Sequence, residues 1–259
     1  MSALAQLMHD AGHEVSGSDR EASPTTELLE KKGILVSIGQ KAENVPNDAS
    51  LVVYSEAVWE DNVERIRAKE LGITQVSYFA QLGEVSKGKR TIAVAGTHGK
   101  TTTTGMTAKI LRDAGASPTA VVGSIVQDFG SNYLHGDSDL FVAEACEYKR
   151  DFLCLSPTYL VVTNVEWDHT DYYKDLADFQ AAFRAMMEKV PADGAIITNA
   201  SHPNIAPLLS GLTPQIIDYT KEPAYELRLP GAFNEDNARA AAAAARIAFP
   251  SVPEETIRA

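Results

Sequence analysis

The first 90 residues alternate between short apolar runs and amphipathic stretches. Apolar runs of about four or five residues indicate strands, and apolar positions spaced three or four apart indicate helices. Such alternation favours a parallel sheet covered by helices. We predict helices over Ser2–Ala11, from Ser23 and Pro24 to Gly33 and over about Glu60–Leu71, and strands over Glu14–Gly17, Ile34–Ile38, Leu51–Tyr54 and Ile73–Ser77.

A second series of the same kind begins at Thr91, after the basic stretch Ser86–Arg90, which we interpret as a linker. Its first predicted strand, Thr91–Ala95, leads through a glycine-containing loop into a helix over Lys100–Ala114. The chain is therefore predicted to be an α/β protein built from two units. The further predicted elements are strands Ala120–Gly123, Leu140–Ala143, Tyr159–Thr163 and Ala195–Thr198, and helices over about Leu176–Val190 and Glu235–Phe249.

Both ends of the chain interrupt this pattern. The chain opens inside a helix, whereas a dinucleotide-binding sheet begins with a central strand and a glycine loop. At the other end, Ser251–Glu254 has the pattern of a capping box that starts a new helix, five residues before the last residue. We therefore expect a fragment whose N-terminal sheet lacks its first strand, and we expect residues before Lys87 to be less stable than those after Arg90.

The composition is that of a folded chain. Of 259 residues, 44% are apolar and 22% are charged, which excludes disordered and collagen-like classes. The formal net charge of −12 disfavours nucleic acid as a partner, and no apolar run or leader sequence indicates membrane insertion or export. We therefore expect a cytoplasmic protein in which Cys146 and Cys154 are free thiols.

The strongest chemical signal is Ala95–Thr102, with the sequence AGTHGKTT. A glycine loop between a strand and a helix presents backbone N–H groups to anions, and the helix dipole adds to this preference. Lys100 supplies a positive charge for phosphates, and the Thr101 hydroxyl is a candidate magnesium ligand. Because Val94 stands where the strict phosphate-loop consensus has glycine, a tight turn with a surface lysine is the alternative to a phosphate site.

Polar residues follow two further predicted strands. Glu144 ends one apolar run, and Glu166, Asp168 and His169 follow another. Ligands of open α/β sheets gather beyond the carboxyl ends of strands, so each of these residues is a candidate cation ligand or base beside a triphosphate. A solvated turn for Glu144 and a structural role for His169 are the alternatives.

Two asparagines, Asn234 and Asn237, lie at the start of the last long predicted helix. Their spacing of three places them on one helical face. They either cap the helix or present their amides to a heterocyclic base.

Taken together, these segments resemble the Mur ligase family, the ATP-dependent amino-acid ligases of peptidoglycan precursor synthesis. Four motifs occur in the family's order, and the resemblance covers nearly the whole chain. They are GTHGKTTTT at 96–104, EACEYKRDFL at 144–153, VVTNVEWDHTDYY at 161–173 and FNEDNARAAAA at 233–243. The opening segment and the histidine in the loop are similar to the members that add alanine.

The resemblance implies a three-domain fold, of which the third domain is absent here. It implies that residues 1–86 are a truncated Rossmann-like domain for the UDP-sugar and that residues 87–259 are a P-loop-type α/β ATPase. The implied activity joins L-alanine to UDP-N-acetylmuramate through an acyl phosphate, with ADP and phosphate as products. ATP and Mg²⁺ are the implied cofactors.

The resemblance also implies roles for individual residues. Lys100, Glu144 and His169 would be catalytic. The phosphates of ATP would contact Gly96, Thr97, His98, Gly99, Lys100, Thr101 and Thr102; Mg²⁺ would contact Thr101, Glu144 and His169; adenosine would contact Asn234 and Asn237; and the UDP-sugar would contact Asp19 and Ser55.

Several departures from the family pattern leave alternatives open. Cys146 stands where the alanine-adding members commonly have aspartate, and Phe233 stands where they commonly have histidine. The alternatives are a related ligase that attaches a whole peptide to UDP-N-acetylmuramate in recycling, and a non-catalytic module that binds Mg-ATP.

Overall fold

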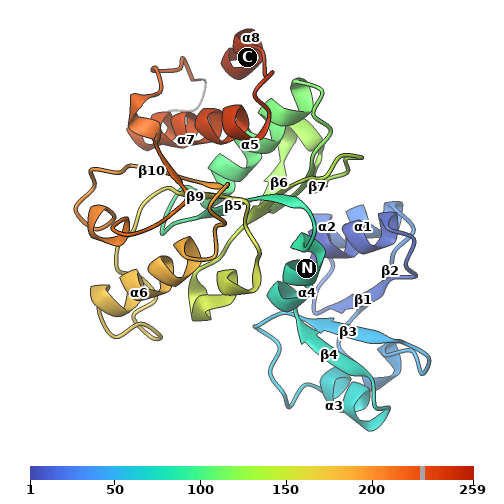
Figure 1. The fold of residues 1–259 in the computed structure, drawn as a ribbon. Helices are drawn as coiled ribbons and strands as arrows, with labels where there is room; N and C mark the ends of the chain where they lie inside the picture. The colour runs from blue at the N-terminus through green and yellow to red at the C-terminus, as the bar shows by residue number, and fades with distance from the viewer. Residues whose placement is uncertain (228–230) are drawn as a thin grey trace.

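A seven-stranded sheet forms the centre of the computed structural model, which describes residues 1–227 and 231–259 (Figure 1). Its order among the described residues is β11-β10-β9-β5-β8-β6-β7, and only the β6–β7 pairing is antiparallel. The sheet is therefore mixed, whereas the sequence predicts a parallel one. Its strands are β5 (Arg90–Ala95), β6 (Thr119–Val126), β7 (Ser131–Leu134), β8 (Leu140–Glu144), β9 (Tyr159–Val162), β10 (Ala195–Thr198) and β11 (Gln215–Asp218).

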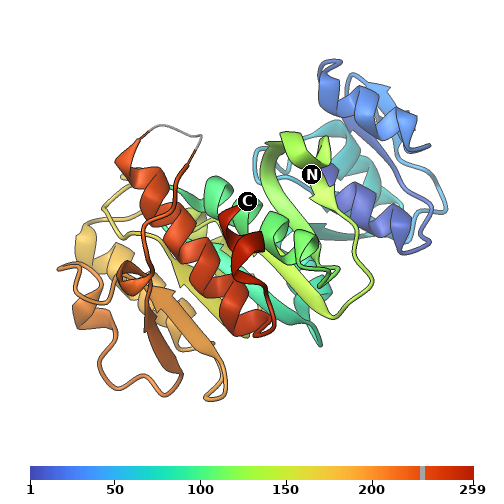
Figure 2. The same cartoon turned by 90° about the horizontal axis from the view of Figure 1, so that it is seen from above.

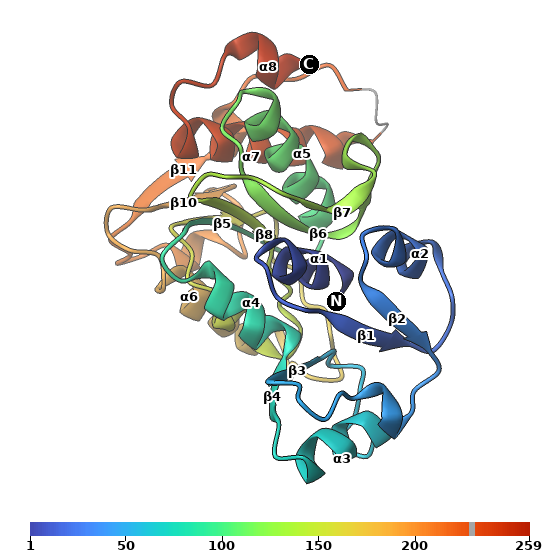
Figure 3. The same cartoon turned by 90° about the vertical axis from the view of Figure 1, so that its right-hand side faces the viewer.

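Helices cover both faces of this sheet (Figures 2 and 3). Successive residues of β5 point to opposite faces, so Ile92 and Val94 join one buried cluster while Ala93 and Ala95 join the other. The first cluster lies under α5 (Lys100–Asp113), α7 (Ala232–Ala248) and α8 (Glu254–Arg258); the second lies under α1 (Ser2–Asp10), α4 (Tyr78–Ser86) and α6 (Leu176–Met187).

The remaining N-terminal elements form two separate pairs of parallel strands. No ladder among the described residues joins the two pairs. In a doubly wound sheet with strand order 3-2-1-4-5, strand 1 lies between strands 2 and 4, so a sheet without it would be divided into two such pairs. The incomplete Rossmann-like domain stays a prediction. The elements are β1 (Ser16–Asp19), α2 (Pro24–Lys31), β2 (Leu35–Ile38), β3 (Leu51–Tyr54), α3 (Val63–Glu70) and β4 (Thr74–Ser77).

Local capping explains where the structure agrees with the predicted boundaries and where it does not. The predicted helix start at Ser23 is confirmed, because the Ser23 and Thr26 side chains form a capping box. The capping box predicted at Ser251–Glu254 is wrong: Pro253 is the N-cap of α8 and has no side-chain capping bond. Short 3-10 turns are η1 (Ala42–Asn44), η2 (Gln127–Phe129), η3 (Tyr148–Cys154), η4 (Ala206–Leu208) and η5 (Tyr219–Lys221).

Helix α4 occupies part of the segment left between the two predicted units. The Ser77 side chain accepts a hydrogen bond from the Ala80 N–H, so the helix starts directly after β4. Leu82 is fully buried in the core beneath the central sheet. The predicted linker thus consists of the end of α4, a three-residue turn over 87–89 and the first residue of β5. None of the helices in the described ranges combines the length and apolar character needed to span a bilayer.

Candidate nucleotide-binding site

The glycine loop Gly96–Gly99 follows β5 and lies between the ends of its two neighbours. Val94 pairs with Glu144 in β8, and Ala95 pairs with Val162 in β9. The parallel register therefore brings the residues after β8 and β9 to the same edge of the sheet as the loop. Three motifs that are far apart in the sequence meet there, as predicted from the strand pattern.

Two glycines allow the loop to turn tightly against its neighbours. Gly96 has a φ of 140°, and a Cβ there would lie 2.0 Å from Thr163 Oγ1. Gly99 has a φ of 82°, and a Cβ there would lie 2.2 Å from Asn237 Oδ1. Both positions exclude a larger residue through conformation and through space.

Hydrogen bonds to the segment after β9 hold the loop in place. The Thr97 hydroxyl donates to the Glu166 carbonyl over 2.9 Å, and the Glu166 N–H donates back to the same hydroxyl. The His98 N–H donates to Asn164 Oδ1 over 2.8 Å, while the His98 ring is exposed and lies 3.8 Å from Glu166. These hydrogen bonds fix the backbone of the loop against the segment after β9.

Helix α5 begins at this loop, with Gly99 as its N-cap in the left-handed conformation. The first-turn amides of an α-helix have no carbonyl four residues earlier within the helix to bond. In α5 these are the amides of Lys100, Thr101 and Thr102, which lie at the positive end of the helix dipole. This arrangement suits an anionic group.

Lys100 reaches across the loop to a buried carboxylate. Its Nζ donates to the carbonyls of Gly96 over 2.6 Å and Thr97 over 3.1 Å, and to Glu147 Oε1 over 3.1 Å. Glu147 is fully buried. Its Oε2 lies 3.0 Å from Lys100 Nζ but has no hydrogen bond of acceptable geometry.

Sequence reasoning missed Glu147. It is the second glutamate of the EACE segment, and no apolar periodicity distinguishes it from Glu144. Only the fold shows that it faces Lys100, because η3 turns sharply directly after it: Lys149 and Arg150 have φ angles of 51° and 64°.

Glu144 lies on the other side of α5's first turn. It accepts hydrogen bonds from the Thr101 hydroxyl over 3.0 Å and from the Gly123 N–H over 2.8 Å. A hydroxyl and a carboxylate oxygen in contact form a suitable pair of ligands for Mg²⁺. The solvated-turn alternative for Glu144 is therefore wrong.

His169 joins the same cluster from the segment after β9. Its Nε2 lies 3.3 Å from Glu147 Oε1, and its ring packs on Tyr148 with 4.8 Å between ring centroids. A φ of 50° places this residue in the left-handed region, which is uncommon for residues other than glycine. Glu166 and Asp168 do not join it: Glu166 lies beside His98, and Asp168 accepts from the His169 N–H.

The described side chains would supply only part of the coordination shell of a cation. Within the described ranges, no group of three His, Cys, Asp or Glu side chains is close enough to hold a metal. Mg²⁺ usually keeps water and phosphate oxygens among its six ligands. The hydroxyl, carboxylate and buried acid seen here fit a cation that arrives with a polyphosphate.

The two asparagines lie in the first two turns of α7, and Asn237 packs against the loop at Gly99. Neither is the N-cap residue of the helix, which is Gly231. Asn237 Oδ1 accepts from the Thr103 hydroxyl over 3.2 Å, and its Nδ2 donates to Asn234 Oδ1. Both side chains are almost fully buried beside α5.

The two residues predicted for the UDP-sugar lie on the N-terminal elements. Asp19 ends β1 and is exposed. Ser55 begins the loop after β3, and this loop reaches the central region: Lys149 Nζ lies 5.5 Å from the centroid of the Trp59 ring. The structure therefore brings the loop of Ser55, through Trp59, to the turn beside Glu147.

Both cysteines are free thiols, as predicted. Burial raises the pKa of Cys146, and the nearby Glu147 carboxylate raises it further. At neutral pH the Cys146 thiol is therefore protonated and unreactive.

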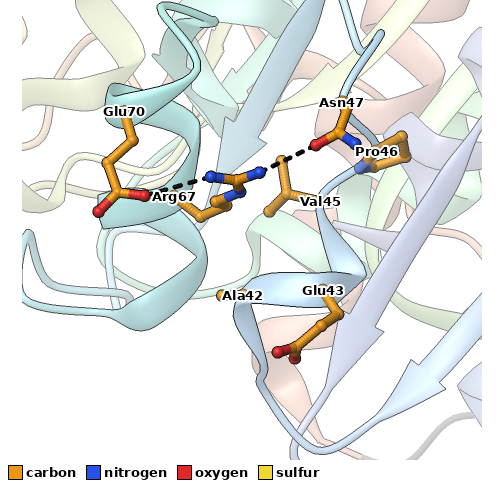
Figure 4. A pocket seen from close by; sticks show the side chains of 7 residues that line it. All are labelled: Ala42, Glu43, Val45, Pro46, Asn47, Arg67 and Glu70. Carbon is orange, nitrogen blue, oxygen red and sulfur yellow. Dashed lines mark hydrogen bonds and ion pairs between the residues drawn. The ribbon is translucent and has the colours of Figure 1, made fainter.

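Two open hollows lie on α3, away from the glycine loop. The first, about 510 Å³, is lined by Ala42, Glu43, Val45, Pro46, Asn47, Arg67 and Glu70 (Figure 4). In it, Arg67 donates to Glu70 over 3.3 Å and to Asn47 over 3.0 Å. Unlike the glycine loop, this hollow has no α-helix N-terminus among its lining residues. The second, about 540 Å³, lies on another side of α3 beside Tyr54 and Arg65.

Comparison with known proteins places this geometry in a family. The Mur ligase family catalytic-domain model matches residues 1–90, and the Mur ligase middle-domain model matches residues 94–225. The chain belongs to the Mur ligase family, and the recognition made from its motifs is confirmed.

Curated relatives support this membership. The chain is 41% identical over 220 residues to the UDP-N-acetylmuramate--L-alanine ligase of Clostridium kluyveri, with 85% of this chain and 48% of that protein covered. It is 39% identical over 251 residues to the ligase of the same name from Agathobacter rectalis, with 96% and 55% covered. The chain therefore spans about half the length of the curated relatives it matches.

Solved structures of similar fold include two kinds of ligase. UDP-N-acetylmuramate:L-alanyl-gamma-D-glutamyl-meso-diaminopimelate ligase from Neisseria meningitides has a TM-score of 0.87 at 28% identity, covering 100% of this chain and 92% of that one. UDP-N-acetylmuramate-alanine ligase from Thermotoga maritima has a TM-score of 0.83 at 28% identity, covering 100% and 65%.

Proposed function

We propose that this chain is the nucleotide-binding part of a cytoplasmic, ATP-dependent ligase that joins L-alanine to UDP-N-acetylmuramate, releasing ADP and phosphate. The observation that carries the proposal is the meeting of three motifs at the end of β5. There, Lys100 and Thr101 begin α5; Thr101 contacts Glu144, and Lys100 and His169 both contact Glu147. The curated relatives named for this reaction support the choice of substrates.

Each site residue has a distinct task in this proposal. The loop amides and Lys100 bind the phosphate oxygens and neutralise their charge. Thr101 and Glu144 hold Mg²⁺, with His169 as a further ligand; when bound, this ion screens the repulsion between the attacking carboxylate and the γ-phosphate. Asn237 packs on Gly99 and accepts a hydrogen bond from Thr103, and it thereby orients the loop relative to the adenosine of ATP.

The reaction divides one difficult condensation into two steps. The carboxylate of UDP-N-acetylmuramate attacks the γ-phosphate and forms an acyl phosphate while ADP leaves. The amine of L-alanine then attacks the acyl carbon and displaces phosphate. The loop of Ser55, which reaches η3 through Trp59, is the element that we propose carries the UDP-sugar toward this centre.

Lys100→Met tests the proposal through binding of ATP with Mg²⁺ to the purified chain. We expect about a tenfold to hundredfold loss of affinity, because a charge-assisted hydrogen bond contributes about 1.5–3 kcal/mol. Lys109→Met is the matched control: Lys109 lies on the same helix but pairs with Asp113 at 2.6 Å on the surface. Equal affinities for wild type and Lys100→Met would refute the phosphate site.

The identity of the amine substrate needs a separate test. The similarity to the Neisseria meningitides ligase favours a peptide as the second candidate. A fusion of this chain to the remaining half of a curated relative would allow L-alanine and a tripeptide to compete for one acyl phosphate. We expect alanine to be incorporated; preferential incorporation of tripeptide would support the recycling ligase instead. For the unfused chain we expect Mg-ATP binding without product.

A further inference from the structure

Glu147 is a buried acid placed where an anionic nucleotide is proposed to bind. We propose that Glu147 makes phosphate binding at the Gly96–Gly99 loop conditional on a divalent cation, by opposing the binding of nucleotide that carries no cation. This inference rests on the proposed function of the loop.

The contacts of Glu147 explain why its charge matters. It is fully buried, its Oε1 accepts from Lys100, and the same oxygen lies beside His169 Nε2. Its Oε2 has no hydrogen bond. Water therefore screens this carboxylate little, and Lys100 is its main compensating charge.

Contacts of the Glu147 backbone hold its carboxylate at this position. The Tyr173 hydroxyl and the Arg150 N–H both donate to the Glu147 carbonyl. The left-handed turn at Lys149 and Arg150 follows directly. Conformations of this kind persist only where the surroundings stabilise them, so Glu147 has little freedom to leave the site.

The Glu147 charge affects the binding of metal-free ATP and of ATP with a divalent cation differently. Metal-free ATP would place several negative charges beside Lys100 and force this one lysine to neutralise both the nucleotide and Glu147. A divalent cation at Thr101 and Glu144 reduces the negative charge of the arriving nucleotide, so the Glu147 charge repels this complex less than it repels metal-free ATP. Glu147 acts on the nucleotide through Lys100 and through charge, as a specificity-determining residue.

The experiment measures the affinity of the purified chain for ATP with Mg²⁺ and for ATP with EDTA. Glu147→Gln keeps the shape of the side chain and removes its charge. In this variant we expect the ratio of the affinity for ATP with Mg²⁺ to the affinity for metal-free ATP to fall about tenfold, mainly because metal-free ATP binds more tightly. Glu147→Asp keeps the charge and should retain most of the wild-type ratio. A structural role alone would weaken both forms of ATP equally and leave the ratio unchanged.

Asp171→Asn is the matched control. Asp171 is an exposed acid two residues after His169 and accepts from the Tyr148 hydroxyl over 2.8 Å, so solvent screens its charge. We expect this variant to change the ratio by less than about twofold.

Thermal unfolding of each variant accompanies the titrations. If Glu147→Gln does not fold, Glu147→Met fills the same buried space without a polar group and takes its place. An unchanged ratio in the folded neutral variant, or a parallel loss for both forms of ATP, would overturn the inference. Wild-type chain that binds neither form would instead refute the proposed function, so the two failures are distinguishable.

Discussion

The central seven-stranded sheet and the two outlying strand pairs are built from similar α/β units but differ in how they are buried. In β5, five of six residues are buried, and β10 is buried throughout. In β3, Leu51–Tyr54 is just as apolar, yet every residue is only half-buried. The same kind of strand thus lies in a covered seven-stranded sheet in one region and in a half-buried two-stranded ladder in the other.

The candidate site belongs to the more deeply buried region. Every residue proposed for the phosphates or the cation lies on β5, β8, β9, α5 or α7, or on a loop that they anchor. Helices α1 and α4 come from the first part of the chain, but they pack on the central core through Leu4, Leu7 and Leu82. The loop after β3 brings the outlying region close to the turn beside Glu147.

Truncating one side chain in each region should give the largest contrast. Phe141→Ala removes a fully buried ring from β8 and should lower the free energy of unfolding by about 3–5 kcal/mol. Val53→Ala removes half-buried methyl groups from β3 and should cost about 1 kcal/mol. Urea denaturation measures both. Comparable losses of unfolding free energy in the two variants would mean that β3 is buried to the same degree as β8, and the contrast between the regions would not hold.

A smaller, pH-dependent effect is expected where the two regions meet. Burial and, as a smaller effect, the Glu56 carboxylate in the outlying region together raise the pKa of Asp151 in η3 to about 6. The folded chain therefore binds this proton more tightly than the unfolded chain, and its stability decreases as pH rises through about 6.

Asp151→Asn removes the loss of stability that ionisation of the Asp151 carboxyl causes. At pH 8 the variant should be more stable than wild type by about 1 kcal/mol or less, because solvent screens a half-exposed carboxyl. The advantage should shrink between pH 6 and about 4, as wild-type Asp151 becomes protonated. Thermal unfolding across this range measures the effect, with the exposed Asp48→Asn as control. A constant difference at all pH values would show that charge is not the cause.

Much of the central fold could be predicted because its strands are continuous apolar runs. The bounds of β10 agree with those predicted, and those of β5, β8 and β9 each differ by one residue. In the outlying region, the bounds of β3 also agree with those predicted. Helix α4 was missed because Ser77 caps it directly at the end of β4, without a glycine or proline to mark the boundary. Strands β7 and β11 lie at the sheet edges, and no alternating pattern distinguishes them from the surrounding loops.

In the candidate site, only the residues that belong to recognisable sequence motifs could be predicted. Lys100, Thr101, Glu144 and His169 follow strands, so the rule for parallel sheets brings them together. The contact of Glu147 with Lys100 depends on the left-handed turn at Lys149 and Arg150, which no local pattern indicates. The packing of Asn237 on Gly99 depends in the same way on how α7 crosses α5.

Amide hydrogen exchange of the purified chain, with and without ATP and Mg²⁺, tests the central claim most directly. Without ligand, amides of β5, β8 and β9 should exchange most slowly and those of β1–β4 fastest. Addition of Mg-ATP should protect Gly96–Thr102 and the start of α7, while β1–β4 should not change. Protection confined to the hollows on α3, or no protection at any concentration, would contradict the account.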